Sequence, residues 1–177
     1  MDKNYFILPY IKVDGIPVLR DSELITIYNK LVAEKLDIIL FSTEAEMSPD
    51  RFVSIMKSDG TLLLLAEDSE NNIAGILWLN RFEGKSARMH FCIFKNWWGK
   101  SSEIMQLFRE HVFSLVDSFG LPIFNTVVGY IPSVNTHAIR CALRDGCKLC
   151  GVIPDYFWDY RVGKMIDATV VYVKGEV

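Results

Sequence analysis

Three apolar segments separated by short polar turns constrain the fold of this 177-residue chain more than any other feature of its sequence. The three segments span residues 61–68, 73–82 and 86–94. Strands joined by such short turns pair antiparallel. The hydrophobic period then becomes helical from Ser101 or Ser102 to about Ser118, and a further strand follows at 124–133. A long helix between two strands is the crossover that parallel pairing requires.

The remaining segments complete a mixed α/β (α+β) pattern. Helices are expected at 22–36, from Pro49 and at 135–146, and strands at 148–154 and 168–175 around an aromatic loop at 155–165. We therefore predict a central, twisted, mainly antiparallel sheet of about six to seven strands, with helices on both faces. Nothing in the sequence resembles a linker, so residues 1–177 are expected to form one domain.

Composition excludes several classes of partner. The chain has 22 acidic and 19 basic residues and no basic stripe, which argues against nucleic acid as a partner. The N-terminal segment lacks the order of a signal peptide, and no apolar run reaches the roughly 18 residues of a membrane span. A cytoplasmic protein that does not bind membranes is expected.

The four cysteines are expected to be reduced thiols in that compartment. Cys147 and Cys150 form a C-x-x-C pair, which raises the alternative of a redox or zinc module. Zinc would need a second pair of ligands, and none occurs at a usable spacing. We expect no metal site, and we interpret the pair as small apolar residues at a helix-to-strand junction.

The segment at the start of the crossover helix, Gly99-Lys100-Ser101, resembles the end of a P-loop. A P-loop needs a glycine five positions before Gly99, where this chain has Phe94, so a nucleoside-triphosphate site is not expected. The start of a helix nevertheless binds anions through its unpaired amides. Ser101 and Ser102 can also cap the helix, so an ordinary capped helix is the alternative interpretation.

A second motif follows the strand at 124–133. Asn135 precedes a helix, a small residue follows at Ala138, and Ile139 and Gly146 complete the pattern. With the strand–loop–helix at 88–108, this motif resembles the GNAT superfamily of N-acyltransferases, which bind acyl-coenzyme A. The resemblance covers roughly residues 60–175 in the order of strands and helices.

The diphosphate motif of that superfamily fits the loop in two registers. With Gly99 as its central glycine, Asn96 takes the first position and Ser101 the last. A register shifted by two residues matches the Trp-Gly-Lys run at 98–100 instead.

The resemblance implies that coenzyme A lies in a V-shaped gap between the strand ending near Phe94 and the strand at 124–133. Main-chain groups before the loop would pair with the pantetheine arm, and amides of the loop would bind the diphosphate. The implied cofactor-binding residues are Cys92, Ile93, Phe94, Trp98, Gly99, Lys100, Ser101, Ser102 and Asn135.

The general acid of the superfamily is often a tyrosine on the second motif's helix, and Ala142 occupies that position here. Cys141 is adjacent, but neighbouring helical residues point about 100° apart, so it is a poor substitute. Tyr130 or Ser133 could reach inward from the end of the strand, or water could protonate the leaving thiolate.

His90 is the first candidate for the general base, because it lies on the strand beside the implied cofactor and its ordinary pKa, about 6.5, suits proton removal. Alternation places it on the same face as Cys92 and Phe94. Hydrogen bonding within the sheet is the alternative role. Glu67 is the second candidate, although a solvated residue at a strand end would look the same. His137 is expected to be a surface group on its helix.

The aromatic stretch at 156–160, with Asp155 and Asp159, suits an amine-bearing acceptor. An interface in a homodimer is the alternative. Trp97 and Trp98 pose a similar choice, between a lid over the cofactor and simple packing.

The sequence therefore predicts an enzyme that moves an acetyl or other short acyl group from acyl-coenzyme A to a small-molecule or peptide amine. A catalytically inactive coenzyme-A-binding or structural protein of the same fold is the second hypothesis. The second hypothesis is supported by Ala142, which stands where the superfamily often has its tyrosine general acid.

Overall fold

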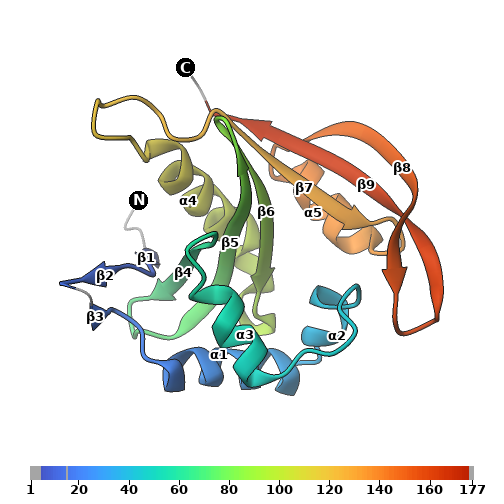
Figure 1. The fold of residues 1–177 in the computed structure, drawn as a ribbon, viewed down its shortest axis with the longest axis horizontal. Helices are drawn as coiled ribbons and strands as arrows, with labels where there is room; N and C mark the ends of the chain where they lie inside the picture. Colours follow the sequence, from blue (N-terminus) through green and yellow to red (C-terminus); the bar gives the residue numbers. More distant parts are fainter. Residues whose placement is uncertain (1–4, 15, 176–177) are drawn as a thin grey trace.

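The computed structural model describes residues 5–14 and 16–175, and a seven-stranded sheet forms its centre (Figure 1). The strand order is β1-β4-β5-β6-β7-β9-β8. The bounds are β1 Tyr5–Pro9, β4 Leu62–Asp68, β5 Ile73–Glu83, β6 Ser86–Ile93, β7 Thr126–Pro132, β8 Lys148–Asp159 and β9 Lys164–Lys174. Neighbouring strands are antiparallel except β6 and β7, which are parallel. The predicted mixed, mainly antiparallel sheet is confirmed.

A separate small ribbon pairs β2 (Lys12–Val13) with β3 (Ile16–Pro17). The predicted single domain at 1–177 also includes residues 1–4, 15, 176 and 177, which lie outside the described residues. No helix within the described part of the chain is both long enough and apolar enough to cross a membrane.

Helices cover both faces of the sheet (Figure 1). The helical elements are α1 Asp21–Ala33, α2 Asp37–Leu40, α3 Pro49–Met56, the 3₁₀ helix η1 Lys95–Lys100, α4 Ser101–Ser114 and α5 Thr136–Arg144. The apolar faces of α1 and α3 pack with Trp78 and Cys92 on one face of the sheet. On the other face, α4 packs through Phe108 against Leu77. A smaller cluster joins α5 to β7 and β9.

Helix α4 ends at Ser114, so the predicted extension to Ser118 is wrong. The backbone becomes extended at Leu115, although the apolar pattern continues. The Asp117 carboxylate accepts hydrogen bonds from the amides of Phe119 and Leu121, at 2.8 and 2.9 Å. This local side-chain bonding stabilises a turn in competition with the helix.

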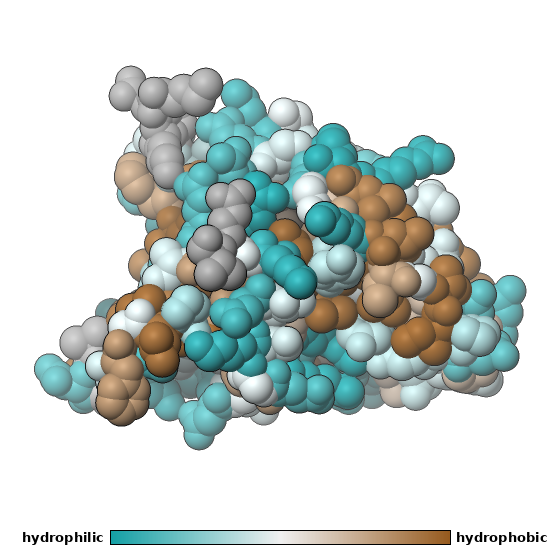
Figure 2. All heavy atoms as spheres, turned by 90° about the horizontal axis from the view of Figure 1, so that it is seen from above, coloured by the Kyte–Doolittle hydropathy of each residue, from teal (hydrophilic) through white to brown (hydrophobic). Residues whose placement is uncertain are grey.

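The predicted aromatic loop at 155–165 is also wrong, because most of it belongs to a long β-hairpin. Phe157 pairs with Ile166 and Trp158 with Met165, after a register shift that follows Ile153. Aromatic residues fit a pleated surface well, so they extend the strands. The β8–β9 hairpin projects from the sheet, and hydrophobic surface gathers on that side of the molecule (Figures 1 and 2).

The ladder between β6 and β7 is short. Three residue pairs form it, which are Ser86 with Thr126, Ala87 with Val127 and Arg88 with Val128. Beyond Arg88 the two strands diverge, while each keeps its antiparallel partner on the other side. The predicted gap between these strands is present, and it positions the candidate site.

Candidate functional site

The divergence of β6 and β7 opens into a cavity of about 490 Å³, which we call the crevice. Its walls come from β6 at 89–93, β7 at 129–132, the α1–α2 connection, the start of α4, and α5. The lining is mostly apolar, with a small number of polar side chains. This composition is typical of a small-molecule site.

Seven of the predicted site residues line the crevice. These are His90, Cys92, Ile93, Trp98, Ser101, Tyr130 and Asn135. Phe94 is fully buried beneath α1 and does not line it. Gly99, Lys100 and Ser102 also lie outside the lining, and Lys100 forms an exposed 3.7 Å ion pair with Glu103. Their proposed contacts with a cofactor stay predictions.

The two other catalytic candidates also lie outside the crevice lining. Glu67 is at the end of β4, where burial and then the charges of Glu23 and Asp68 raise the pKa of its carboxyl group. The Ser133 hydroxyl is 2.9 Å from the Thr169 hydroxyl. Neither side chain is brought next to His90 by the fold.

His90 lies inside the crevice wall with its ring stacked on Trp78, at 4.8 Å between ring centroids and 5° between planes. Its Nε2 is 3.3 Å from the side-chain oxygen of Asn80, which leaves Nδ1 as the acceptor nitrogen of the neutral ring. Burial, followed by the charges of Arg88 and Arg81, lowers the pKa of His90 to about 4. The imidazole is therefore neutral at pH 7, but it is a weak base.

Tyr130 lies at the open end of β7 and belongs to an aromatic and cationic cluster. The Arg88 guanidinium is 4.3 Å from the centroid of the Tyr130 ring and donates a 2.8 Å hydrogen bond to the Tyr156 hydroxyl. The rings of Tyr130 and Tyr156 stack at 5.3 Å. These contacts hold Tyr130 in one orientation at the crevice wall.

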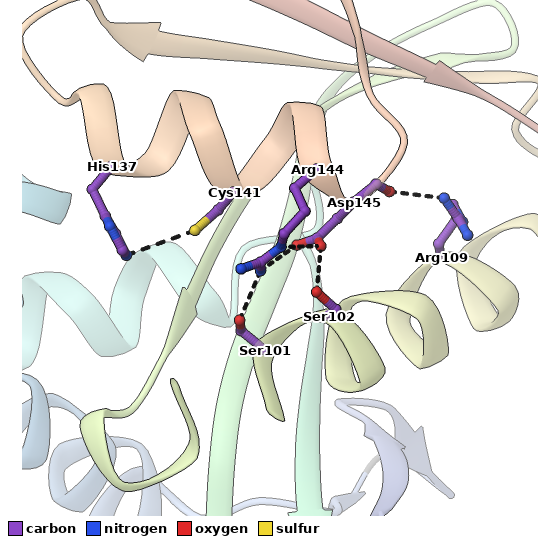
Figure 3. Close-up of polar contacts among 7 residues, drawn as sticks. All are labelled: Ser101, Ser102, Arg109, His137, Cys141, Arg144 and Asp145. Carbon is purple, nitrogen blue, oxygen red and sulfur yellow. Dashed lines mark hydrogen bonds and ion pairs between the residues drawn. The ribbon is translucent and has the colours of Figure 1, made fainter. Parts of the chain in front are cut away.

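The start of α4 is linked to the end of α5 by side chains (Figure 3). The Arg144 guanidinium donates a 2.9 Å hydrogen bond to the Ser101 hydroxyl and is 3.0 Å from the Asp145 carboxylate. The Ser102 hydroxyl donates to the same carboxylate at 2.7 Å. Asp145 thus places a negative charge near the positive end of α4.

The loop predicted before α4 is the 3₁₀ helix η1, which runs directly into α4. The Ser101 amide bonds to the Trp98 carbonyl, so one amide proposed for the diphosphate already has a partner within the chain. The Trp98 indole donates a 2.9 Å hydrogen bond to the Ile93 carbonyl. Trp98 lines the crevice, whereas Trp97 is partly buried and packs against the core beneath Lys30, which lies 4.5 Å from its ring.

The crevice is also lined by three basic side chains, which the sequence motifs did not indicate. These are Lys35, Lys95 and Arg144. Asp145 is the acidic residue among the lining residues. The excess of positive charge suits a ligand that carries phosphate groups. Lys35 has a backbone φ of 56° between α1 and α2, and no sequence pattern placed it here.

Asn135 caps α5, as its position before the helix predicted. Its side chain accepts a 3.1 Å hydrogen bond from the Ala138 amide. Ser48 caps α3 in the same way, at 3.2 Å from the Arg51 amide, and it does not line the crevice.

The paired caps allow a test of Asn135. Asn135→Ala and Ser48→Ala should each lower the free energy of unfolding by about 1 kcal/mol, because each removes one cap. Only Asn135→Ala should also weaken binding of coenzyme A. Urea unfolding and calorimetric titration measure the two effects, and equal binding by both variants would contradict a role for Asn135 in the site.

The aromatic stretch is separated from the crevice lining, apart from its contact through Tyr156 with Tyr130. Asp159 is buried and paired with Arg161 at 2.5 Å, and this pair lowers the pKa of the carboxyl group. Its charge is therefore neutralised within the hairpin. Asp155 is exposed, and its amide donates to the Asp167 carboxylate at 3.1 Å.

Cys147 and Cys150 lie at the junction of α5 and β8, where the Cys147 amide bonds to the Ala142 carbonyl at 2.9 Å. All four cysteines are free thiols. Among residues 5–14 and 16–175, no group of three or more His, Cys, Asp and Glu side chains has a geometry that could hold a metal ion.

Comparisons with known proteins identify the fold. No family model matches the chain, and no curated relative matches it either. Among solved structures, spermidine N-acetyltransferase from Vibrio cholerae in complex with CoA and spermine superposes with a TM-score of 0.72 at 15% identity. This match covers 98% of this chain and 96% of the other.

A second solved structure is the acetyltransferase from Salmonella typhimurium that modifies the N-terminal serine of ribosomal protein L7/L12. Its TM-score is 0.73 at 14% identity, and the match covers 98% of this chain and 96% of that one. The order of strands and helices from β4 to β9 and the gap after β6 agree with the resemblance found in the sequence. The chain has the fold of the GNAT superfamily of N-acyltransferases.

Proposed function

We propose that this protein is an acyl-coenzyme-A-dependent N-acyltransferase that moves an acetyl or other short acyl group to an amine. The observation that carries the proposal is the crevice, which opens where β6 and β7 separate after three residue pairs. The neighbour solved with CoA and spermine shares this fold over nearly its whole length.

The residues of the crevice fit the proposed acyl donor. The diverging strands leave main-chain groups facing the gap, and such groups can pair with the amides of a pantetheine arm. Lys35, Lys95 and Arg144 supply positive charge for phosphates. When bound, the donor supplies an activated thioester. The Trp98 indole already donates to the Ile93 carbonyl, so a ligand at this point would use the second lone pair of that oxygen.

The acid–base residues follow from position in the crevice. Tyr130 presents a phenol at the open end of β7 and is the proposed proton donor to the leaving thiolate, in place of the tyrosine missing at Ala142. His90 is neutral at working pH and is the proposed proton acceptor, although a pKa of about 4 makes it inefficient. An acceptor amine that arrives already deprotonated would need little help.

The acceptor is a small-molecule or peptide amine; the neighbours are named for spermidine and for a protein N-terminal serine. A cytoplasmic location is proposed. Exposed apolar side chains on the β8–β9 hairpin support a homodimer through that surface, and the Vibrio cholerae spermidine N-acetyltransferase is described as dodecameric.

A donor-binding protein without transferase activity is the second candidate. It is favoured by the weak base at His90 and by Ala142 at the usual tyrosine position. Both candidates share the crevice and differ only in turnover.

One experiment separates these candidates. Calorimetry and thermal unfolding with acetyl-coenzyme A measure binding, and a thiol-release assay across a panel of amines measures transfer. Binding with turnover supports the enzyme, and binding without turnover supports the second candidate. If saturating donor produces neither heat nor a shift of the melting temperature, both are excluded.

Asp145 gives a more specific prediction for the donor. Its carboxylate lies near the start of α4, where a bound diphosphate would meet like charge. Asp145→Asn keeps the shape and removes the charge, so affinity for coenzyme A should rise about two- to fivefold, the range expected for one charge at a helix end. A titration at low salt measures this change, and weaker binding would show that the carboxylate instead organises Arg144 for the ligand.

A further inference from the structure

Cys141 and His137 form a close pair on α5 that faces the crevice. The Cys141 Sγ lies 3.6 Å from the His137 Nε2, and both residues line the cavity (Figure 3). They are one helical turn apart, and Arg144 continues the same stripe one turn later. The Trp98 ring packs against the imidazole at 5.8 Å between centroids. The pair is thus held in the wall of the crevice.

A thiol beside an imidazole has the geometry of an activated nucleophile. Burial raises the pKa of the Cys141 thiol, an effect that Arg144 partly opposes and Asp145 reinforces. At neutral pH the group is therefore a thiol, and its reaction requires a base within reach. His137 is that base, because an imidazole nitrogen lies at hydrogen-bonding distance from the sulfur.

We propose that Cys141, with His137 as its general base, takes the acyl group from acyl-coenzyme A and forms a thioester on the protein. This inference rests on the proposed function, because the acyl donor must enter the crevice. It adds a covalent acceptor site to a direct transfer between donor and amine.

The step is balanced without an oxidant or a metal. The Sγ proton moves to His137 Nε2 as Sγ attacks the thioester carbon, so a new carbon–sulfur bond forms at Cys141. The bond to the coenzyme A sulfur then breaks, and the proton passes from His137 to the leaving thiolate. An amine or water can later remove the acyl group from Cys141 by the same chemistry.

The other cysteines serve as internal controls. Cys92 is buried, and burial raises the pKa of its thiol to about 12, so it should not react. Cys150 is exposed on β8 and outside the crevice lining, so it reports the uncatalysed reaction of a protein thiol. Cys147 is partly buried, and burial raises the pKa of its thiol as well.

Mass spectrometry of the intact protein and its peptides after incubation with acetyl-coenzyme A tests the inference. Cys141 should gain one acetyl group at pH 7 at least about 100-fold faster than Cys150, and His137→Gln should remove about 100-fold of that rate, the usual contribution of a general base. Cys141→Ser should abolish the site, whereas Cys150→Ser should leave the labelling of Cys141 unchanged. Hydroxylamine should release the label, as expected for a thioester.

Calorimetry of the same variants with coenzyme A separates this inference from the proposed function. Binding without acetylation of Cys141, or equal labelling of Cys141 and Cys150, overturns the nucleophile and leaves the transferase proposal standing. Absence of binding overturns both. If Cys141→Ser unfolds, the comparison of His137→Gln with the unmodified protein still decides, because His137 is exposed at the first turn of α5.

Discussion

Replacing Ala138 with tryptophan should lower the affinity for acetyl-coenzyme A by about 100-fold or more, equivalent to about 3 kcal/mol. Ala138 lies on the face of α5 that lines the crevice, and its small side chain leaves the wall open. An indole at this position would occupy the space between α5 and the diverging strands. The donor would then meet a filled cavity.

Leu143→Trp is the matched control for this experiment. Leu143 belongs to the same helix but is 41% exposed and does not line the crevice. The same side chain placed there should leave donor affinity within about twofold of the unmodified protein, as expected of a surface substitution. Calorimetry, with circular dichroism as a check on folding, measures both variants. Tight binding by a folded Ala138→Trp protein would place the donor elsewhere.

The second large effect is acid destabilisation through His90. The folded state holds the pKa of this imidazole at about 4, whereas the ordinary value is 6.5. Between these two pH values the unfolded chain binds more protons than the folded one, so the free energy of unfolding decreases as the pH falls. The loss approaches about 1.4 kcal/mol per pH unit and totals about 3 kcal/mol by pH 4.

His90→Phe isolates this contribution, because phenylalanine can stack on Trp78 but does not titrate. Urea unfolding between pH 7 and pH 4.5 should show a shallower loss of stability for the variant, since the carboxyl groups contribute to both proteins alike. Parallel curves for the two proteins would mean that His90 takes up its proton readily in the folded state. That result would also restore His90 as an efficient base.

The sequence predicted the central elements well where local pattern and tertiary packing agree. The run at 61–68 and the capped helix at Pro49 each form where expected, as β4 and α3. β1 was missed because five residues ending in Pro9 carry little periodicity, and pairing with β4 is what makes them a strand. The break between α1 and α2 was missed for a related reason. Lys35 turns the chain there with a positive φ, and lysine is not a residue type that predicts such a turn.

The candidate site was predictable only in part. Alternation along β6 and the cap at Asn135 are local properties, and both were predicted correctly. The link from Ser101 to Arg144 joins residues 43 positions apart and depends on how α4 and α5 cross. His137 and Cys141 were each interpreted alone; their spacing of four residues on a helix brings them together, but only the packing of α5 places them in the crevice wall.

The short ladder between β6 and β7 has a consequence for the dynamics of the free protein. It divides the sheet into a four-stranded part and a three-stranded part that share three residue pairs, with α4 as the covalent bridge between them. Amides that face the gap, from residue 129 onward on β7, should exchange with deuterated water far faster than those in the antiparallel ladders. Any molecule that completes the missing rungs would act as an added strand, slow this exchange and join the two parts into one cooperative unit.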